Sequence, residues 1–161
     1  MDLSSIKSVL ERYSIKLSQS AYNEIKIMLR AKIKRTHMAF LLDQSNHVIV
    51  YRPNIYFKTK SFPFSQHAEI NAIINYYSKQ LSKKITNGSK RLLVIRFGGT
   101  CLRMSRPCRN CAAFIANNWD NLHLKEVLYS DNYENLVSLT REDLLQSSNF
   151  CLSAASRISA S

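Results

Sequence analysis

The first quarter of the chain shows helical spacing and then the pattern of a β-hairpin. Apolar residues recur at the spacing of a helix face within residues 6–13 and again within residues 22–33. Two short apolar runs follow, at residues 38–42 and 48–51, and the polar residues 43–46 between them are suited to a turn. We therefore expect two N-terminal helices followed by a β-hairpin.

The middle of the chain alternates between strand and helix patterns. Residues 55–66 are rich in aromatic side chains and contain Pro63, and we expect an irregular loop there. A helix with one apolar stripe is predicted over residues 67–83, and a buried strand over residues 92–97. A loop over residues 98–105, a helix to about residue 117 and a strand at residues 127–129 are predicted next.

The end of the chain decides how the last two strands pair. Residues 131–134 resemble a turn and residues 136–139 a strand, and Thr140 with Asp143 resembles a capping box that begins a short helix. So short a link permits an antiparallel pair, because a parallel pair needs a crossover of about a dozen residues or more. We expect the antiparallel pair. The alternative makes residues 133–145 a helix.

This order of elements predicts an α/β fold. Strands that alternate with helices form a sheet with parallel pairings, covered by helices on both faces. The 161 residues can bury a sizeable core, and a hydrophobic content of 45% is typical of globular proteins. We expect one domain over residues 1–161, with N-terminal helices (1–35), a core (36–140) and a C-terminal helix and tail (141–161).

Two short motifs supply candidate metal ligands and one further carboxylate. His67 and Glu69 form the first motif, and Pro107, Cys108 and Cys111 form the second. Zinc binds nitrogen and sulfur ligands, with four protein ligands in structural sites and an open position in catalytic sites. Two cysteines three residues apart can reach one metal from the start of a helix, whose N-terminus also favours thiolates. The pattern offers three ligands, the catalytic number.

The pattern H-x-E…P-C-x-x-C resembles the signature of the cytidine deaminase-like superfamily of zinc-dependent nucleoside, nucleotide and nucleic-acid deaminases. The resemblance covers roughly residues 36–140. It implies a three-layer α/β/α fold with a mixed five-stranded sheet, in which the two motifs begin adjacent helices. It also implies one zinc per chain on His67, Cys108 and Cys111, with Glu69 as the catalytic proton carrier.

Two features bear on the branch of the superfamily. An antiparallel final strand pair is similar to the free cytidine deaminase branch and several deaminase toxins. A parallel pair is similar to the tRNA adenosine, deoxycytidylate and AID/APOBEC branches. The segment of residues 70–106 between the motifs is longer than in compact members, and its part before Pro107 is placed to influence substrate choice.

Two other interpretations of the motifs are open. A purely structural zinc needs a fourth protein ligand, for which the candidates are Cys101, Cys151, His37 and His123. A redox C-x-x-C pair explains neither His67 nor the carboxylate two residues after it.

The chain is strongly basic, with a formal net charge of +12, which favours a polyanionic substrate or partner. Arg103, Arg106 and Arg109 lie in and before the cysteine motif, and Lys58 and Lys60 lie in the segment that leads to the histidine motif. We expect the three arginines to bind substrate phosphate. The charge alone does not separate a nucleotide from a nucleic acid, and solvated lysines are the alternative explanation.

Residues before the histidine motif are further candidates. Family members often place an asparagine at the position of Asn54 to contact the sugar or base, and an ordinary turn residue after a proline explains it equally well. Phe57, Phe62 and Phe64 can stack on a base or pin the segment to the core.

We therefore expect a zinc-dependent hydrolase that converts cytosine to uracil in a nucleotide or a single-stranded nucleic acid. An adenosine deaminase acting on nucleic acid is one alternative. A non-catalytic, zinc-stabilised module that binds nucleic acid is another, although Glu69 would serve no purpose there. No signal peptide or membrane span is evident, and four cysteines do not make a disulfide framework, so we expect the cytoplasm or the nucleus. A homo-oligomer is compatible with the sequence.

Overall fold

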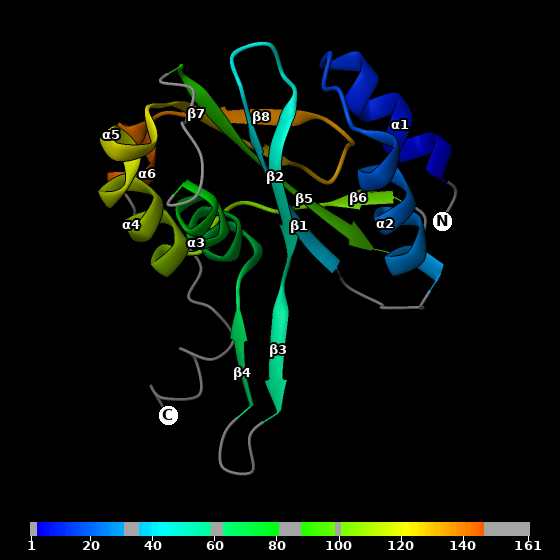
Figure 1. Cartoon of the computed structure of the whole chain (residues 1–161), viewed down its shortest axis with the longest axis horizontal. Helices are drawn as coiled ribbons and strands as arrows, with labels where there is room; N and C mark the ends of the chain where they lie inside the picture. The colour runs from blue at the N-terminus through cyan, green and yellow to red at the C-terminus, as the bar shows by residue number, and fades with distance from the viewer. Residues whose placement is uncertain (1–2, 31–35, 59–62, 81–87, 99–100, 147–161) are drawn as a thin grey trace.

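The computed structural model describes residues 3–30, 36–58, 63–80, 88–98 and 101–146 (Figure 1). The chain begins with α1 (Leu3–Arg12), α2 (Gln19–Arg30), β1 (Thr36–Leu42), β2 (Val48–Pro53), β3 (Ile55–Lys58) and β4 (Pro63–Gln66). It continues through α3 (Ala68–Gln80), β5 (Lys90–Gly98), β6 (Cys101–Arg103) and α4 (Arg109–Asn117). The last elements are α5 (Trp119–Leu122), β7 (Leu124–Ser130), β8 (Leu136–Leu139) and α6 (Arg141–Leu145).

A mixed sheet forms the centre of the fold, with the strand order β2-β1-β5-β7-β8. Strand β1 is antiparallel to both β2 and β5, β5 is parallel to β7, and β7 is antiparallel to β8. The short strand β6 pairs with the carboxyl end of β5. The predicted α/β class, the mixed sheet, the N-terminal hairpin and the antiparallel final pair are thereby confirmed.

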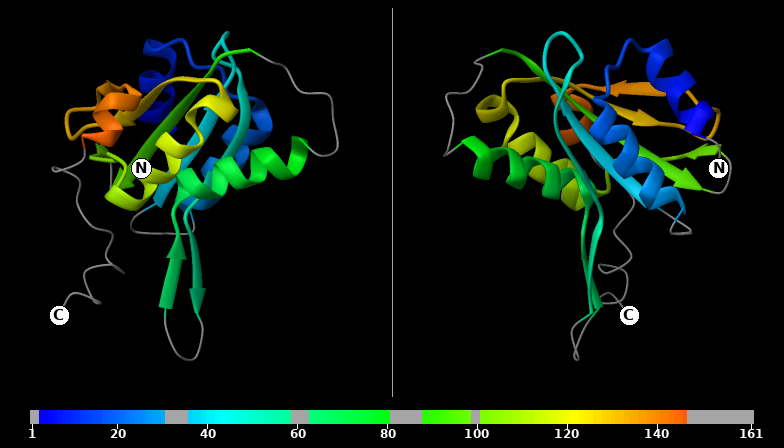
Figure 2. Two further views of the ribbon diagram at one scale, coloured as in Figure 1. Left: turned by 90° about the vertical axis from the view of Figure 1, so that its left-hand side faces the viewer. Right: turned by 45° about the vertical axis from the view of Figure 1, so that its right-hand side comes forward.

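Side chains along a strand point alternately to opposite faces of the sheet. Apolar side chains on both faces of this sheet are buried against helices. On β5, Leu92 and Val94 belong to the core cluster that contains residues of α3, α4 and α6, whereas Leu93 and Ile95 belong to the cluster that contains residues of α1 and α2. Figure 2 shows α3 and α4 on one side of the sheet and α1 and α2 on the other. The first of these two faces carries the candidate metal ligands.

Two segments that were predicted as loops contain strands. Residues 55–66 were expected to be irregular, but β3 and β4 pair antiparallel, with Phe57 opposite Phe64, and project from the body of the molecule (Figure 1). Pro63 is tolerated because it is the first residue of its strand. Residues 98–105 were also expected to be a loop, and β6 lies within them. Lys60 and Phe62 lie outside the described residues.

The C-terminal part follows the prediction. Thr140 caps α6 in a capping box: its Oγ1 accepts a hydrogen bond from the Asp143 backbone N–H at 3.3 Å, and the Asp143 carboxylate accepts one from the Thr140 N–H at 2.8 Å. The alternative of one helix over residues 133–145 is wrong, since β8 occupies residues 136–139. Across the described ranges, no helix has both the length and the apolar character that crossing a membrane requires.

Candidate metal centre

The ligand-bearing residues stand at the starts of two neighbouring helices. His67 directly precedes α3, and its carbonyl oxygen accepts the helical hydrogen bond of the Asn71 N–H at 3.0 Å. Cys108 is the N-cap residue of α4, and its carbonyl oxygen accepts from the Ala112 N–H at 2.8 Å. Both helix N-termini therefore face one site, and their positive dipole ends favour anionic groups there.

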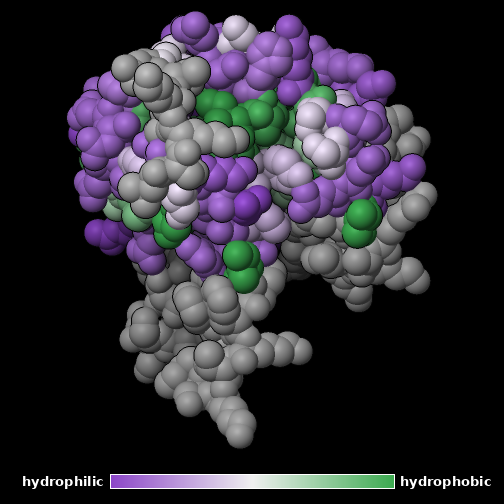
Figure 3. Space-filling model, in the orientation of Figure 1, coloured by the Kyte–Doolittle hydropathy of each residue, from purple (hydrophilic) through white to green (hydrophobic). Residues whose placement is uncertain are grey.

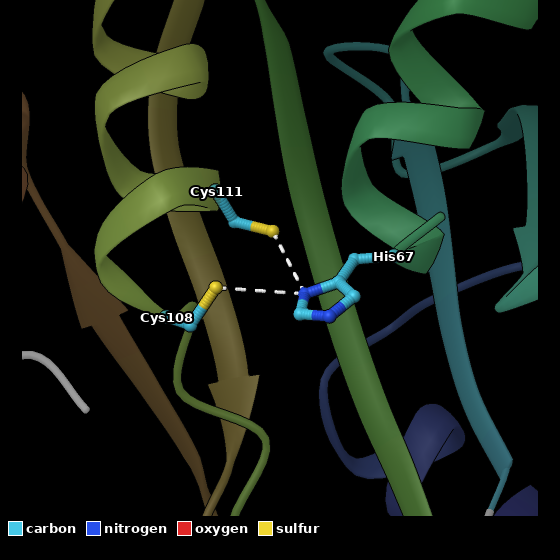
Figure 4. Close-up of side chains that lie close together, drawn as sticks. All are labelled: His67, Cys108 and Cys111. Atoms are coloured by element: carbon cyan, nitrogen blue, oxygen red, sulfur yellow. Dashed lines mark hydrogen bonds between the residues drawn. The ribbon is translucent and has the colours of Figure 1, made fainter. Parts of the chain in front are cut away.

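Three side chains from these helix starts converge (Figure 4). His67 Nδ1 lies 3.2 Å from Cys111 Sγ and 3.5 Å from Cys108 Sγ. The three candidate ligand atoms all lie within 4.8 Å of one another. Cys108 and Cys111 are free thiols, and Cys111 is fully buried in the core. The group can hold one metal ion.

The environment of the two thiols favours the loss of a proton. In the metal-free protein, the hydrogen bond from Cys111 is the largest cause that lowers the pKa of Cys108 to about 4, and His67 adds to it. The pKa of Cys111 is raised, because its proton is shared with the Cys108 sulfur and because it is buried. The surroundings therefore favour the thiolate form at Cys108, the form in which cysteine binds a metal.

Glu69 lies within α3 next to this group without belonging to it. Its side chain is only 4% exposed, and burial raises the pKa of its carboxyl above the ordinary value. A backbone hydrogen bond, the charge of His67 and a hydrogen bond with Cys111 act in the opposite direction on this pKa. The structure therefore places a buried carboxyl, hydrogen-bonded to Cys111, beside the candidate ligands.

Asn54 holds the start of α3. Its Oδ1 accepts a hydrogen bond from the Ala68 backbone N–H at 2.7 Å, and its own N–H donates to the His37 carbonyl oxygen at 3.1 Å. The Asn71 side chain donates to the Pro53 carbonyl oxygen at 3.0 Å and ties the same helix to the end of β2. Asn54 therefore positions His67, whether or not it also contacts a substrate.

A buried pair of serines fixes the segment that leads to Cys108. The Ser105 hydroxyl donates to the Val94 carbonyl oxygen at 2.7 Å and accepts from the Ser130 N–H at 2.8 Å. The Ser130 hydroxyl donates to the Arg103 carbonyl oxygen at 2.7 Å and lies 2.8 Å from the Ser105 hydroxyl. These bonds join the ends of β5, β6 and β7 three residues before the first cysteine ligand.

We expect Ser105→Ala to lower the free energy of unfolding by about 1–3 kcal/mol, because it leaves the buried Val94 carbonyl and Ser130 N–H without a partner. Metal affinity should fall as well, because the segment before Cys108 loses its anchor. Urea denaturation and a chelator competition assay measure the two effects. Ser78→Ala is the matched control, since Ser78 is exposed on α3. Equal stabilities of the two variants would refute the role of the serine pair.

His37 lies beside the site but is not one of the grouped ligands. Burial, followed by the positive charges of Arg96 and His67, lowers the pKa of His37 to about 4. Within the described part of the chain, the metal-binding group contains only three residues. Of the other candidate fourth ligands, His123 ends α5 in the left-handed conformation, Cys101 begins β6, and Cys151 lies outside the described residues.

The lowered pKa of His37 makes an acid-sensitivity prediction. Between pH 6.5 and about pH 4 the unfolded chain binds a proton at His37 that the folded chain does not, so stability falls as the pH falls through this range. We expect His37→Gln to lose less unfolding free energy than the wild type between these two pH values. Denaturation curves at several pH values measure this unfolding free energy for both proteins. The same pH dependence in both would contradict the lowered pKa of His37.

The three arginines predicted to bind phosphate lie at separate positions between β6 and the start of α4, and all three are exposed. Arg103 is exposed on β6, opposite Arg96 of β5. Arg106 is exposed, and its charge helps to lower the pKa of Asp143 on α6. Arg109 is exposed at the first position of α4. The face in Figure 3 is mostly hydrophilic, with apolar side chains in scattered spots and one recess.

No protein-family model matches this chain, and a comparison with curated proteins finds no match either. The similarity of this chain to the zinc deaminase motif therefore consists of the spacing of His67, Cys108 and Cys111 and of their convergence into one group. His37, Arg96, Ser105 and Ser130 are the residues near the site that sequence reasoning missed or dismissed. Their positions depend on strand register, for which the local sequence carries no signal.

Proposed function

We propose that this protein is a zinc-dependent deaminase that hydrolyses cytosine to uracil in a phosphate-bearing substrate. One observation carries the proposal. Among the described residues, a group of three candidate ligands, the number typical of a catalytic site, adjoins a buried carboxyl, Glu69, that is not part of the group. A structural metal site has no use for such a carboxyl.

The donor atoms suit zinc. One imidazole nitrogen and two sulfurs are ligands that zinc prefers, and tetrahedral zinc with ordinary bond lengths places nitrogen and sulfur ligands roughly 3.6 Å apart. The observed Nδ1 to Sγ distances of 3.2 and 3.5 Å are close to that separation. When bound, zinc supplies a water molecule whose pKa is lowered toward neutrality.

Glu69 is the proton carrier in this proposal. Burial raises the pKa of the Glu69 carboxyl, which favours the uptake of a proton that general acid–base catalysis must later return. The carboxyl takes a proton from the attacking water, and protons then reach a ring nitrogen and the departing amine. The overall reaction consumes one water and releases one ammonia for each cytosine converted.

Two observations bear on the substrate. The antiparallel pair of β7 and β8 is similar to the free cytidine deaminase branch, and this favours cytosine over adenine. The net charge of +12 favours a substrate that carries phosphate. Asn54, Arg103, Arg106 and Arg109 stay the predicted substrate-binding residues, and the bond from the Ala68 N–H ties Asn54 to the start of α3.

The test is ammonia release from a panel of CMP, dCMP, cytidine, AMP, single-stranded DNA and single-stranded RNA. The zinc-loaded protein should release ammonia from at least one phosphate-bearing cytosine substrate, and the protein stripped by a chelator should release none. Release from adenine substrates alone would favour the adenosine deaminase alternative. Tight nucleic-acid binding with no ammonia from any substrate would favour a non-catalytic module.

A further inference from the structure

A row of basic side chains crosses the sheet at the carboxyl end of β5. The register of β1 and β5 places His37 opposite Arg96, and the register of β5 and β6 places Arg96 opposite Arg103. Directly opposed residues on neighbouring strands project to the same face of a sheet. The three side chains therefore lie side by side on one face.

This face is the one that carries the metal ligands. Leu92 and Val94 of β5 pack into the cluster that includes Cys111, and Arg96 follows on the same face, two residues beyond Val94. His37 stands in the same relation to Ala39 on β1. The His37 carbonyl oxygen accepts a hydrogen bond from the Asn54 N–H, and Asn54 Oδ1 accepts one from the N–H of the residue that directly follows His67, so the row begins near the histidine motif.

One buried donor of Arg96 has no acceptor. Its Nε is buried and has no hydrogen-bond partner, and its Nη1 approaches the Met104 carbonyl oxygen only at 3.5 Å. None of the ion pairs among the described residues involves it. Arg91, on the same strand, is different: its Nε lies 2.9 Å from the Glu126 carboxylate. A buried guanidinium donor without an acceptor is costly, and an anionic ligand would satisfy it.

We propose that Arg96, with the neighbouring Arg103, binds the phosphate of a substrate whose cytosine occupies the metal site. The planar guanidinium fork matches phosphate oxygens, and two adjacent guanidinium groups match the charge of a phosphate. The position is also favourable, because ligands of open α/β sheets bind beyond the carboxyl ends of the strands. This inference rests on the proposed function and assigns its phosphate site to a residue outside the cysteine motif.

Binding of product-like ligands tests the site without turnover. The zinc-loaded chain is titrated calorimetrically with uridine, with UMP and with a short oligouridylate. We expect the wild type to bind UMP about 10–100-fold more tightly than uridine, as charge-assisted hydrogen bonds imply. Arg96→Gln should bring this ratio close to one with little change in uridine affinity, and Arg103→Gln should lower it in part. Arg12→Gln, with the same loss of charge on α1 at the other sheet face, should keep the wild-type ratio.

The ligands also separate the two sources of phosphate. A preference for UMP indicates a nucleotide, whereas an Arg96-dependent preference for the oligouridylate alone, with a steep salt dependence, indicates a polynucleotide. If Arg96→Gln does not fold, Arg103→Gln decides, because its side chain is exposed. The inference is overturned if the wild type binds neither phosphate ligand more tightly than uridine, or if the arginine variants keep the wild-type ratio.

Turnover is measured on the same samples, so the two proposals can fail separately. Arg96-dependent binding of UMP or the oligouridylate without ammonia release from any cytosine substrate would remove the deaminase and leave the phosphate site. Ammonia release with an unchanged binding ratio in Arg96→Gln would remove the phosphate site and leave the deaminase.

Discussion

Glu69→Gln is expected to lower turnover by about 10²–10⁴-fold, the usual contribution of general acid–base catalysis, while the metal stays bound. The amide has nearly the shape of the carboxyl but cannot accept and return a proton. Glu69 adjoins the ligand group without belonging to it, so its neutral isostere should leave the group intact. Steady-state ammonia release and zinc content per chain, measured on one sample, give both values.

The control for this substitution is Glu142→Gln, which removes an exposed carboxylate from α6. It should keep wild-type turnover and zinc content. Loss of zinc from Glu69→Gln would make Glu69 a ligand rather than a proton carrier, and full activity would exclude any catalytic role.

Cys111→Ser is expected to remove the metal. Cys111 is buried in the core, and its sulfur lies 3.2 Å from His67 Nδ1, so the variant loses one of three ligands where no other side chain can replace it among the described residues. Loss of a hydrogen-bonding partner behind a ligand already costs about 10–100-fold in metal affinity, and loss of a ligand should cost more. Competition with a chromogenic zinc chelator measures the affinity.

The matched controls are Cys101→Ser and Cys151→Ser, which change the two cysteines outside the motif. Both should bind zinc as the wild type does. A large loss of zinc in either variant would identify a fourth protein ligand and a structural metal site. Unaltered zinc binding by Cys111→Ser would remove the proposed site altogether.

The central sheet and the ligand group were predictable because both depend on short sequence patterns. The polar residues 43–46 between two apolar runs gave the β1–β2 hairpin, and Thr140 with Asp143 gave the capping box of α6. The histidine and cysteine motifs each begin a helix, and adjacent helix starts in this fold bring their side chains together. Chain length between the motifs does not alter that geometry.

The β3–β4 hairpin and the strand β6 were missed for a local reason. The sequence of residues 55–66 has no Asn-Gly or Asp-Gly turn signal, and Pro63 lowered the expectation of a strand there. Strand β6 contains only three residues, too few to show a periodicity.

Arg96, Ser105 and Ser130 were missed, and His37 was named only as a candidate fourth metal ligand, because long-range register brings these residues to the site. Ser105, just after β6, lies beside Ser130 at the end of β7. His37 on β1 lies opposite Arg96 on β5. His37 taken alone resembles any histidine at a strand edge. Only the pairing of β1 with β5 brings it near His67, and the same pairing gives Arg96 its place beside the site.

Hydrolysis in ¹⁸O-labelled water, followed by mass spectrometry of the base, tests most directly whether this metal centre deaminates cytosine. The zinc-loaded protein is incubated with each cytosine substrate of the panel. We predict that a phosphate-bearing cytosine is converted to uracil that carries one ¹⁸O atom, with the release of one ammonia, and that the Glu69→Gln protein leaves it unconverted on the same timescale. Unchanged cytosine in every substrate, in a protein that holds one zinc on His67, Cys108 and Cys111, would contradict the proposal.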